Sequence, residues 1–186
     1  MLYKIFSHWE KTTLHLISDT HFNDSDLALG IPNRPSAQEL VNIINSKVGR
    51  KDVLVHLGDV GDLDYAKQLR GYKILVCGNH DKGASNYEEV FDEVYTGPLI
   101  INDKIILSHE PITIPGMFNI HGHNHSKGSN DFQHLNVCCD VLDEYLPLNF
   151  KQLYKNGLVS KVSSIHRQTI DKATERRKKN ANRRFY

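Results

Sequence analysis

Short apolar runs that stop abruptly at Asp or Asn recur along this sequence, and they constrain its fold more than any other feature. The runs "LHLIS", "DVLVHL" and "KILVC" have the length and composition of strands, and Asp19, Asp59 and Asn79 follow them within two residues. Between the first two runs, "SAQELVNIINSKV" places its apolar residues on one helical face and opens with a capping box of Ser36 and Glu39. Strands that alternate with helices predict an α/β domain.

The remaining segments extend this pattern and then change it. "DLDYAKQLRG" is predicted to form a short helix that Gly71 ends, and "SNYEEVF" a second short helix capped by Ser85. After these helices, "GPLIIN", "KIILSH", "MFNIHG" and "HLNVC" have the pattern of short strands with turns between them. The first half is therefore predicted to be βαβ and the second half mostly β.

Length and composition fit one domain with a short tail. The chain has 186 residues, 39% of them hydrophobic, which is enough for a core without disulfides. Its net charge of +1 is unevenly spread, because residues 172–186 hold seven Lys or Arg and one Glu (+6), which leaves −5 for the rest. We expect a domain at residues 1–170 and a basic tail at residues 171–186. The tail could bind nucleic acid or another acidic surface, or form a polar terminal helix.

The cysteines and the apolar runs indicate the compartment. Cys77 stands alone and Cys138 adjoins Cys139, which is no disulfide framework and favours a reducing environment. The N-terminal stretch lacks the features of a signal peptide, and no apolar run is long enough to span a bilayer. These features predict a cytoplasmic protein that does not act at a membrane.

Five polar clusters end predicted strands: "SDTH", "HLGDVGD", "CGNHD", "ILSHEP" and "HGHNH". Loops beyond the carboxyl ends of strands converge on ligand sites in α/β sheets. The clusters offer carboxylates, imidazoles and one amide but no thiolate, a mixture that suits Mn, Fe, Zn, Co or Ni. Gly58, Gly78 and Gly122 permit sharp turns or a close approach to an ion. The clusters therefore predict a metal site, and a carboxylate can bridge two cations.

Three histidines in the last cluster, His121, His123 and His125, stand at every second position. In a strand, such positions share one face. The three rings would then crowd one small volume unless they bind something, which again favours a metal.

The five blocks, read in order as "DTH…GDVGD…GNHD…SHEP…GHNH", resemble the calcineurin-like metallophosphoesterase superfamily. They run from Asp19 to His125, and the match is most similar to small, stand-alone bacterial and phage phosphoesterases. The resemblance implies an α/β fold in which two mixed β-sheets pack as a sandwich flanked by helices. It also implies a phosphoric ester hydrolase, either a phosphatase or a phosphodiesterase, with two divalent transition-metal ions, of which manganese is favoured over Fe, Zn, Co and Ni.

The resemblance assigns a role to individual residues. It implies that the first metal is held by Asp19, His21, Asp59 and His125, and that the second is held by Asp59, Asn79, His109 and His123. It further implies that His80 stabilises the transition state or protonates the leaving oxygen, and that Asp62 orients His80. The implied reaction is direct in-line attack on phosphorus by a hydroxide bound to the binuclear centre.

Other polar residues near the blocks leave alternatives open. His56 is either a core residue or a second layer behind the ligands, and His121 is expected in that second layer or in the pocket wall. Arg34 either meets a phosphate or is solvated, and Asp81 either stabilises its loop or caps the next segment. Asp140 could brace the site from behind.

Two other functions compete with a phosphoesterase. A non-catalytic metal-binding scaffold of the same fold predicts lost ligands, whereas every ligand position is filled. A metallo-β-lactamase-type site needs His-x-His-x-Asp-His, but Ser126 follows His125. Within the superfamily, Leu63 and Asp64 follow Asp62 where phosphoprotein phosphatases have Arg-Gly. A nucleotide or nucleic-acid substrate is therefore expected before a phosphoprotein, and a homodimer is an open expectation.

Overall fold

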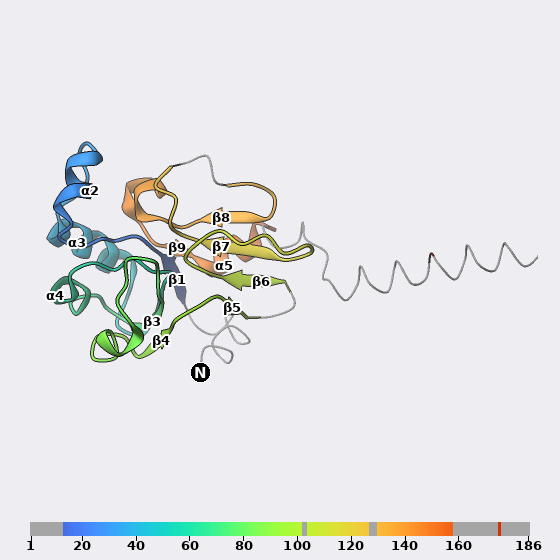
Figure 1. Cartoon of the computed structure of the whole chain (residues 1–186), viewed down its shortest axis with the longest axis horizontal. Helices are drawn as coiled ribbons and strands as arrows, with labels where there is room; N and C mark the ends of the chain where they lie inside the picture. Colours follow the sequence, from blue (N-terminus) through green and yellow to red (C-terminus); the bar gives the residue numbers. More distant parts are fainter. Residues whose placement is uncertain (1–12, 102–103, 127–129, 158–174, 176–186) are drawn as a thin grey trace, which may run out of the picture.

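Two β-sheets face each other in the computed structural model, which describes residues 13–101, 104–126, 130–157 and 175. The first sheet has five strands in the order β4-β3-β2-β1-β9, and the second has four in the order β5-β6-β7-β8. Figure 1 shows the second sheet on one side of the first, with α3 and α4 on the other side. The predicted sandwich of mixed sheets with flanking helices is confirmed.

The first sheet is parallel except at one edge. Its strands are β1 (Leu14–Ile17), β2 (Val53–His56), β3 (Tyr72–Val76), β4 (Glu93–Tyr95) and β9 (Leu148–Asn149). β1, β2, β3 and β4 pair in parallel, and β9 runs antiparallel to β1. Parallel pairing brings the carboxyl ends of these strands to one edge of the sheet.

The second sheet is assembled from the mostly β half of the chain. Its strands are β5 (Leu99–Ile100), β6 (Ile105–Leu107), β7 (Phe118–His121) and β8 (His134–Asn136). β6, β7 and β8 pair in parallel, whereas β5 is antiparallel to β6.

The helices are short apart from one. They are α2 (Ser25–Gly30), α3 (Ala37–Lys47), α4 (Leu63–Ala66) and α5 (Phe150–Lys155), with single 3-10 turns η1 (Ala84–Asn86), η3 (Cys139–Val141) and η4 (Asp143–Tyr145). The predicted capping box is present on α3, where Ser36 accepts from the Glu39 N–H and Glu39 accepts from the Ser36 N–H.

Alternate residues of the first sheet enter two different cores. Leu16 and Val55 face the second sheet and pack in one cluster with Leu107 and Ile120. Their neighbours face α3 instead, where Leu54 joins a second cluster. Because both faces of the sheet are covered, its strands appear in the sequence as continuous apolar runs.

Several expected elements differ from the observed ones. The predicted helix at residues 85–91 is wrong, because a single 3-10 turn begins at Ala84 and no side chain caps it. The helix after Asp62 is shorter than expected and ends at Ala66. The strand β4 and the segments α2, β9 and α5 were not predicted, since each is too short to show a clear hydrophobic period.

The expected basic tail lies outside the described residues except for Glu175, so the boundary at residue 170 stays a prediction. Among the residues that the structure describes, no helix combines the length and the apolar character that crossing a membrane requires.

Candidate metal centre

The loops that follow the parallel strands meet at one edge of the sandwich. The Asp19 N–H donates to the Gly58 carbonyl at 2.9 Å, which ties the loop after β1 to the loop after β2. Ser18 forms an isolated parallel bridge with Cys138, which follows β8. The second sheet therefore meets the first where the polar clusters lie.

Sharp backbone turns carry several of the predicted ligands. Left-handed backbone angles occur at Asp19 (φ 57°), His21 (φ 37°), Asp59 (φ 56°) and His123 (φ 68°). Residues other than glycine rarely adopt this conformation, and such strain is concentrated at functional sites. The strand β7 ends at His121, so the three alternating histidines do not share one strand face, and that expectation is wrong.

Glycines at two of the turns leave no room for a side chain. A Cβ on Gly78 would lie 2.2 Å from Asp59 Oδ1, and a Cβ on Gly122 would lie 2.2 Å from Ser18 Oγ and 2.4 Å from Asp19 Oδ2. These glycines let the backbone pack directly against the two carboxylates, whereas the sequence predicts sharp turns or a close approach to an ion.

The first cluster consists of Asp19, His21, Asp59 and His125. Ligand atoms of Asp19, His21 and Asp59 all lie within 4.8 Å of one another. His21 Nε2 is 3.4 Å from Asp59 Oδ2, and His125 Nε2 is 3.8 Å from Asp19 Oδ1. The two carboxylates are almost completely buried.

The second cluster consists of Asp59, Asn79, His109 and His123. His109 Nε2 lies 2.8 Å from Asn79 Oδ1 and 3.3 Å from Asp59 Oδ2. His123 Nδ1 lies 3.1 Å from the same Asn79 oxygen and 3.3 Å from His109 Nε2. Asp59 belongs to both clusters, so the structure brings all seven predicted ligand residues together.

The contacts of His109 show that the second cluster fits a cation. Its Nδ1 lies 2.9 Å from the Leu57 carbonyl, which can only accept, so Nδ1 carries the proton. In a neutral ring, the Nε2 lone pair would then point at oxygens of Asn79 and Asp59, which are also acceptors. The cluster therefore needs positive charge at Nε2, which either a proton on the ring or a bound cation would supply.

The pKa values of His109 and Asp59 are shifted in the directions that favour positive charge beside the Asp59 carboxylate. Burial alone would lower the pKa of His109, but the Asp59 and Asp19 carboxylates outweigh it and raise that pKa. Burial would raise the pKa of Asp59, yet hydrogen bonds from His109 and His21 hold it far below its ordinary value. Asp19 is different, because burial dominates and raises its pKa.

The two residues predicted to act on the substrate are not joined as expected. His80 is exposed, and its ring lies 5.4 Å from that of His21, centre to centre. Asp62 instead caps α4 by accepting from the Asp64 N–H, and it accepts from Asn23 Nδ2 at 3.2 Å. No hydrogen bond joins Asp62 to His80 in the described part of the chain, because Asp62 is held at the start of a helix.

Asp81 is a supporting residue whose role the sequence left open. Its Oδ2 accepts from the N–H groups of Asp59 and Gly78, both at 2.8 Å, and its Oδ1 accepts from Val60 N–H at 3.0 Å. The Tyr87 hydroxyl donates to Oδ1 as well. Asp81 therefore locks the loops after β2 and β3 against each other.

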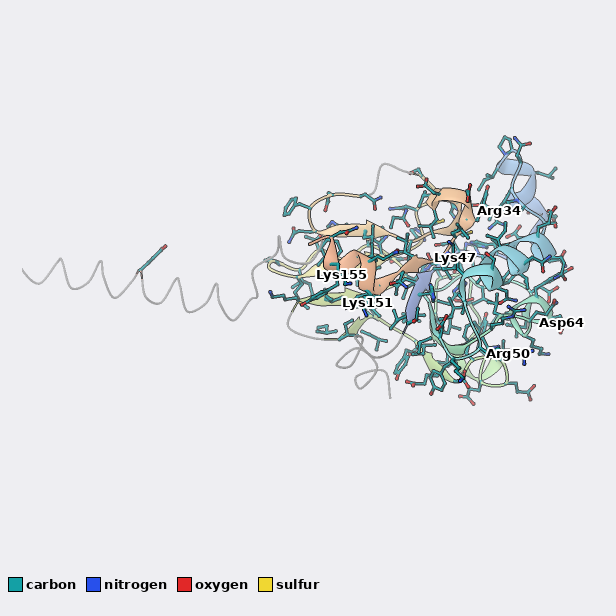
Figure 2. All side chains as sticks on the ribbon, turned by 180° about the vertical axis from the view of Figure 1, so that it is seen from behind. Arg34, Lys47, Arg50, Asp64, Lys151 and Lys155 are labelled. Atoms are coloured by element: carbon teal, nitrogen blue, oxygen red, sulfur yellow. The ribbon has the colours of Figure 1, made fainter. Side chains whose placement is uncertain are left out.

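Arg34 and Asp140 form a buried ion pair behind the first cluster, a pairing that the sequence did not predict. Arg34 Nε donates to Asp140 Oδ1 at 2.8 Å, and Asp140 Oδ2 lies 2.7 Å from His125 Nδ1. The Arg34 side chain is only 4% exposed, so it is neither a solvated cation nor a residue of the cleft mouth. Figure 2 shows it between α2 and the segment that contains η3.

The two other histidines differ in their relation to the site. His56 Nε2 lies 3.0 Å from Thr20 Oγ1, whose proton goes to the Val60 carbonyl, so the His56 ring donates. Thr20 stands between two predicted ligands, which fits support from a second layer. His121 Nδ1 contacts the Gly122 carbonyl at 2.7 Å, and its ring packs against His134, on the side of the second sheet.

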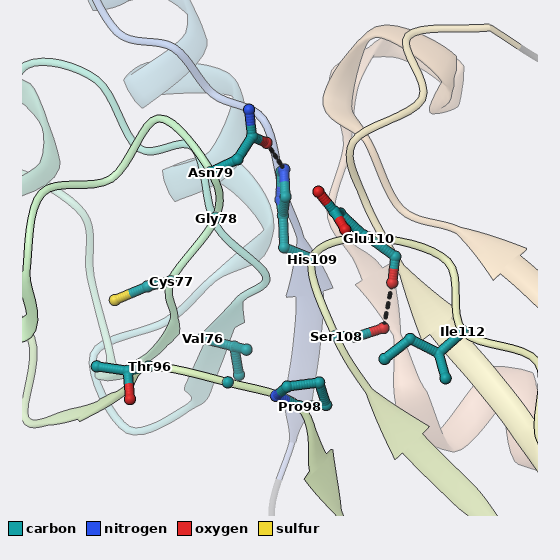
Figure 3. A pocket seen from close by; sticks show the side chains of 11 residues that line it. Val76, Cys77, Gly78, Asn79, Thr96, Pro98, Ser108, His109, Glu110 and Ile112 are labelled. Carbon is teal, nitrogen blue, oxygen red and sulfur yellow. Dashed lines mark hydrogen bonds between the residues drawn. The ribbon is translucent and has the colours of Figure 1, made fainter.

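Cavities open beside both clusters. A cleft of about 720 Å³ includes His21, Asp59, His80, His123 and His125 in its lining and is bounded by α2. A smaller pocket of about 190 Å³ shares Asn79 and His109 with the second cluster and is walled by Thr96, Pro98 and Glu110 (Figure 3). The site therefore has an open face and one narrow recess.

Comparison with known proteins assigns the family. The sequence model of the calcineurin-like phosphoesterase family matches residues 12–177, so the chain belongs to that family. Membership supports a metal-dependent hydrolase of phosphate esters, and the Asp and His clusters supply suitable ligands for divalent ions.

Two similar proteins have no established activity. The chain is 29% identical over 163 residues to the uncharacterized protein MJ1445 of Methanocaldococcus jannaschii, with 76% of this chain and 89% of the archaeal protein covered. The crystal structure of AQ665 from Aquifex aeolicus, a protein of unknown function, matches with a TM-score of 0.66 and 27% identity. That match covers 77% of this chain and 98% of the other.

Substitution of Gly78 tests the geometry of the site. In Gly78→Ala, the new methyl group would clash with Asp59 and His109, so we expect a stability loss of about 1–3 kcal/mol and weaker binding of Mn²⁺. Calorimetric titration with Mn²⁺ and urea unfolding measure the two effects. Gly83→Ala is the matched control, because no heavy atom lies within 4 Å of its added Cβ. Equal Mn²⁺ affinity in both variants would contradict the described geometry.

His56 predicts a pH dependence of stability in the presence of chelator. Burial lowers the pKa of His56 from 6.5 to about 4, so the unfolded chain binds a proton first as the pH falls. The stabilisation is complete above pH 6.5 and is lost from there toward pH 4. Between pH 7 and pH 5, the free energy of unfolding should fall by about 2 kcal/mol more in the wild type than in His56→Leu. Urea titrations at both pH values measure this difference, and equal falls would refute it.

Proposed function

We propose that this protein hydrolyses a phosphate monoester or diester by direct in-line attack of water on phosphorus, with two divalent cations held in the first and second clusters. The observation that carries the proposal is the position of Asp59. One of its oxygens lies 3.4 Å from His21 Nε2 and 3.3 Å from His109 Nε2, so a single carboxylate faces both clusters. Carboxylates in this position bridge the ions of two-metal sites.

The clusters differ in charge but share the same kinds of ligand. The first offers two carboxylates and two imidazoles, and the second offers one carboxylate, one amide oxygen and two imidazoles. This set of oxygen and nitrogen ligands fits manganese, with Fe, Zn, Co and Ni as alternatives. When bound, the ions would acidify the attacking water, neutralise the phosphate oxygens and align the attack.

The surroundings of His80 support a role in acting on the substrate. Its backbone N–H donates to Asp59 Oδ1 at 2.9 Å, which fixes its loop to the shared carboxylate. Its ring is exposed and lines the cleft beside His21. From this position a protonated ring would donate to the leaving oxygen or stabilise negative charge on the phosphate. Asp24 lines the same cleft, and its carboxylate interacts electrostatically with His80.

The shape of the site supports a nucleotide or nucleic-acid substrate before a phosphoprotein. The open cleft of about 720 Å³ leaves room for a phosphate within a longer chain, and a second pocket of about 190 Å³ adjoins Asn79. The Arg that phosphoprotein phosphatases place after the second block is absent, since Leu63 follows Asp62 and begins α4. Location in the cytoplasm and pairing as a homodimer remain part of the same proposal.

A non-catalytic metal-binding scaffold is the competing function. It would need no His80 and no access for a substrate. The exposed His80 ring and the cleft in front of both clusters favour an enzyme.

Asparagine in place of Asp59 tests the proposal. Asp59→Asn keeps the shape of the side chain but removes the charge that both ions would share. We expect at least a ~100-fold loss of phosphate-ester hydrolysis and fewer than two Mn²⁺ ions bound per chain. An aryl phosphate assay and metal analysis measure the two effects. Asp64→Asn, on the exposed face of α4, is the control that should change neither. Unchanged hydrolysis and metal content in Asp59→Asn would end the proposal.

A substrate panel separates the two functions and the substrate classes. With Mn²⁺ added, we expect phosphate or nucleotide release from nucleotides, cyclic nucleotides or short nucleic acids, little release from phosphopeptides, and none with a chelator. Colorimetric phosphate detection and chromatography measure the products. Preference for phosphopeptides would overturn the substrate class, and two bound metals without turnover on any ester would favour the scaffold.

A further inference from the structure

The His125 ring is held from behind by a carboxylate. Its Nδ1 lies 2.7 Å from Asp140 Oδ2, and its Nε2 points toward the first cluster, 3.8 Å from Asp19 Oδ1. An ionised carboxylate only accepts hydrogen bonds, so this contact keeps the proton of the neutral ring on Nδ1. The Nε2 lone pair then faces the position of the first ion. The Cys138 thiol also approaches Nδ1, but at 3.6 Å it makes the longer contact.

Arg34 holds that carboxylate in place. Its Nε donates to Asp140 Oδ1 at 2.8 Å, and the two side chains are 4% and 1% exposed. A terminal nitrogen of the same guanidinium donates to the backbone carbonyls of Asp19 at 3.1 Å and Thr20 at 2.9 Å. One arginine therefore supports both the partner of His125 and the left-handed turn that carries Asp19.

We propose that Asp140 and Arg34 are positioning residues for the first ion: Asp140 sets the His125 tautomer that exposes the Nε2 lone pair, and Arg34 fixes Asp140 and the Asp19 turn. The inference rests on the proposed function, because it assumes that His125 binds a metal. A buried ion pair by itself is weak evidence for stabilisation, since its desolvation cost offsets the attraction. Outer partners of metal-bound histidines, in contrast, tune metal affinity by 10–100-fold.

Asp140→Asn separates positioning from simple packing. Arg34 has only N–H donors, so the new amide must turn its oxygen toward Arg34 and its NH₂ toward His125. His125 Nδ1 must then accept, which moves the ring proton to Nε2 and blocks the lone pair that faces the first cluster. Shape, volume and the contact with Arg34 are retained, so the fold is expected to survive.

Two measurements on the full chain test this step. In chelator at pH 8, long-range ¹H–¹⁵N NMR of the histidine rings should show the Nδ1–H tautomer for His125 in the wild type and the Nε2–H tautomer in Asp140→Asn. In calorimetric titrations with Mn²⁺, one of the two binding steps should weaken by about 10–100-fold in the variant, while the other changes little.

A matched control lies elsewhere on the chain. Asp131 Oδ2 lies 2.9 Å from His134 Nδ1, the same kind of pair as Asp140 and His125, but away from both clusters. Asp131→Asn should leave the Mn²⁺ titration unchanged. Arg34→Lys tests the arginine. The lysine keeps the charge but cannot reach Asp140 and the two carbonyls together, so it should weaken the same Mn²⁺ binding step as Asp140→Asn.

The outcomes distinguish this inference from the proposed function. An Asp140→Asn protein that is folded by circular dichroism and keeps the wild-type tautomer or wild-type Mn²⁺ affinity overturns the role of Asp140. Unchanged affinity in Arg34→Lys overturns the role of Arg34. If the wild type binds two ions and the variants bind one weakly, the inference stands even where no phosphate ester is hydrolysed. If the wild type binds no metal at all, both proposals fall.

Discussion

The arrangement of acceptors around Asp59 is the constraint on which the rest of the structure depends. His109 Nε2 lies 2.8 Å from the Asn79 amide oxygen and 3.3 Å from the buried Asp59 carboxylate, while its other nitrogen contacts the Leu57 carbonyl. Such groups repel one another unless positive charge lies between them. The surrounding structure holds them in place against this repulsion: Asp81 binds three backbone N–H groups of the adjoining loops, and Gly78 lets the backbone approach Asp59 directly.

The two-sheet architecture explains why the clusters can form. The first sheet contributes Asp19, Asp59 and Asn79 from the ends of three neighbouring parallel strands, and the second contributes His109 and His123 from the ends of β6 and β7. The apolar layer between the sheets therefore sets the distance between carboxylates and imidazoles. Packing in this layer is thus part of the site, and Leu57 within it also contacts His109 through its backbone carbonyl.

The sequence predicted the parts of this site that are encoded locally. An apolar strand followed by Asp, Asn or His fixes both the end of the strand and the side chain beyond it, so the seven ligand candidates could be named from short blocks. Contacts between distant segments carry no such signal. Arg34 and Asp140 lie 106 positions apart, and Arg34 is in a loop where a cation is ordinarily solvated. The role of Asp62 stays a prediction, because its block fits the family pattern while the contacts of its side chain are with the start of α4 and with Asn23.

The groups that orient the histidines differ between the two clusters: one is charged and the other is neutral. Behind the first, the buried pair of Arg34 and Asp140 reaches His125 through charged hydrogen bonds. Behind the second, His109 is oriented by the neutral carbonyl of Leu57. The first cluster also has Asp19 in addition to the shared Asp59, whereas the second has Asp59 alone. Charge attraction is stronger in a buried site, so under the two-ion proposal the first cluster would bind a cation more tightly than the second. The exposed His80 ring lies beside His21 of the first cluster, whereas the smaller pocket at Asn79 and His109 adjoins the second.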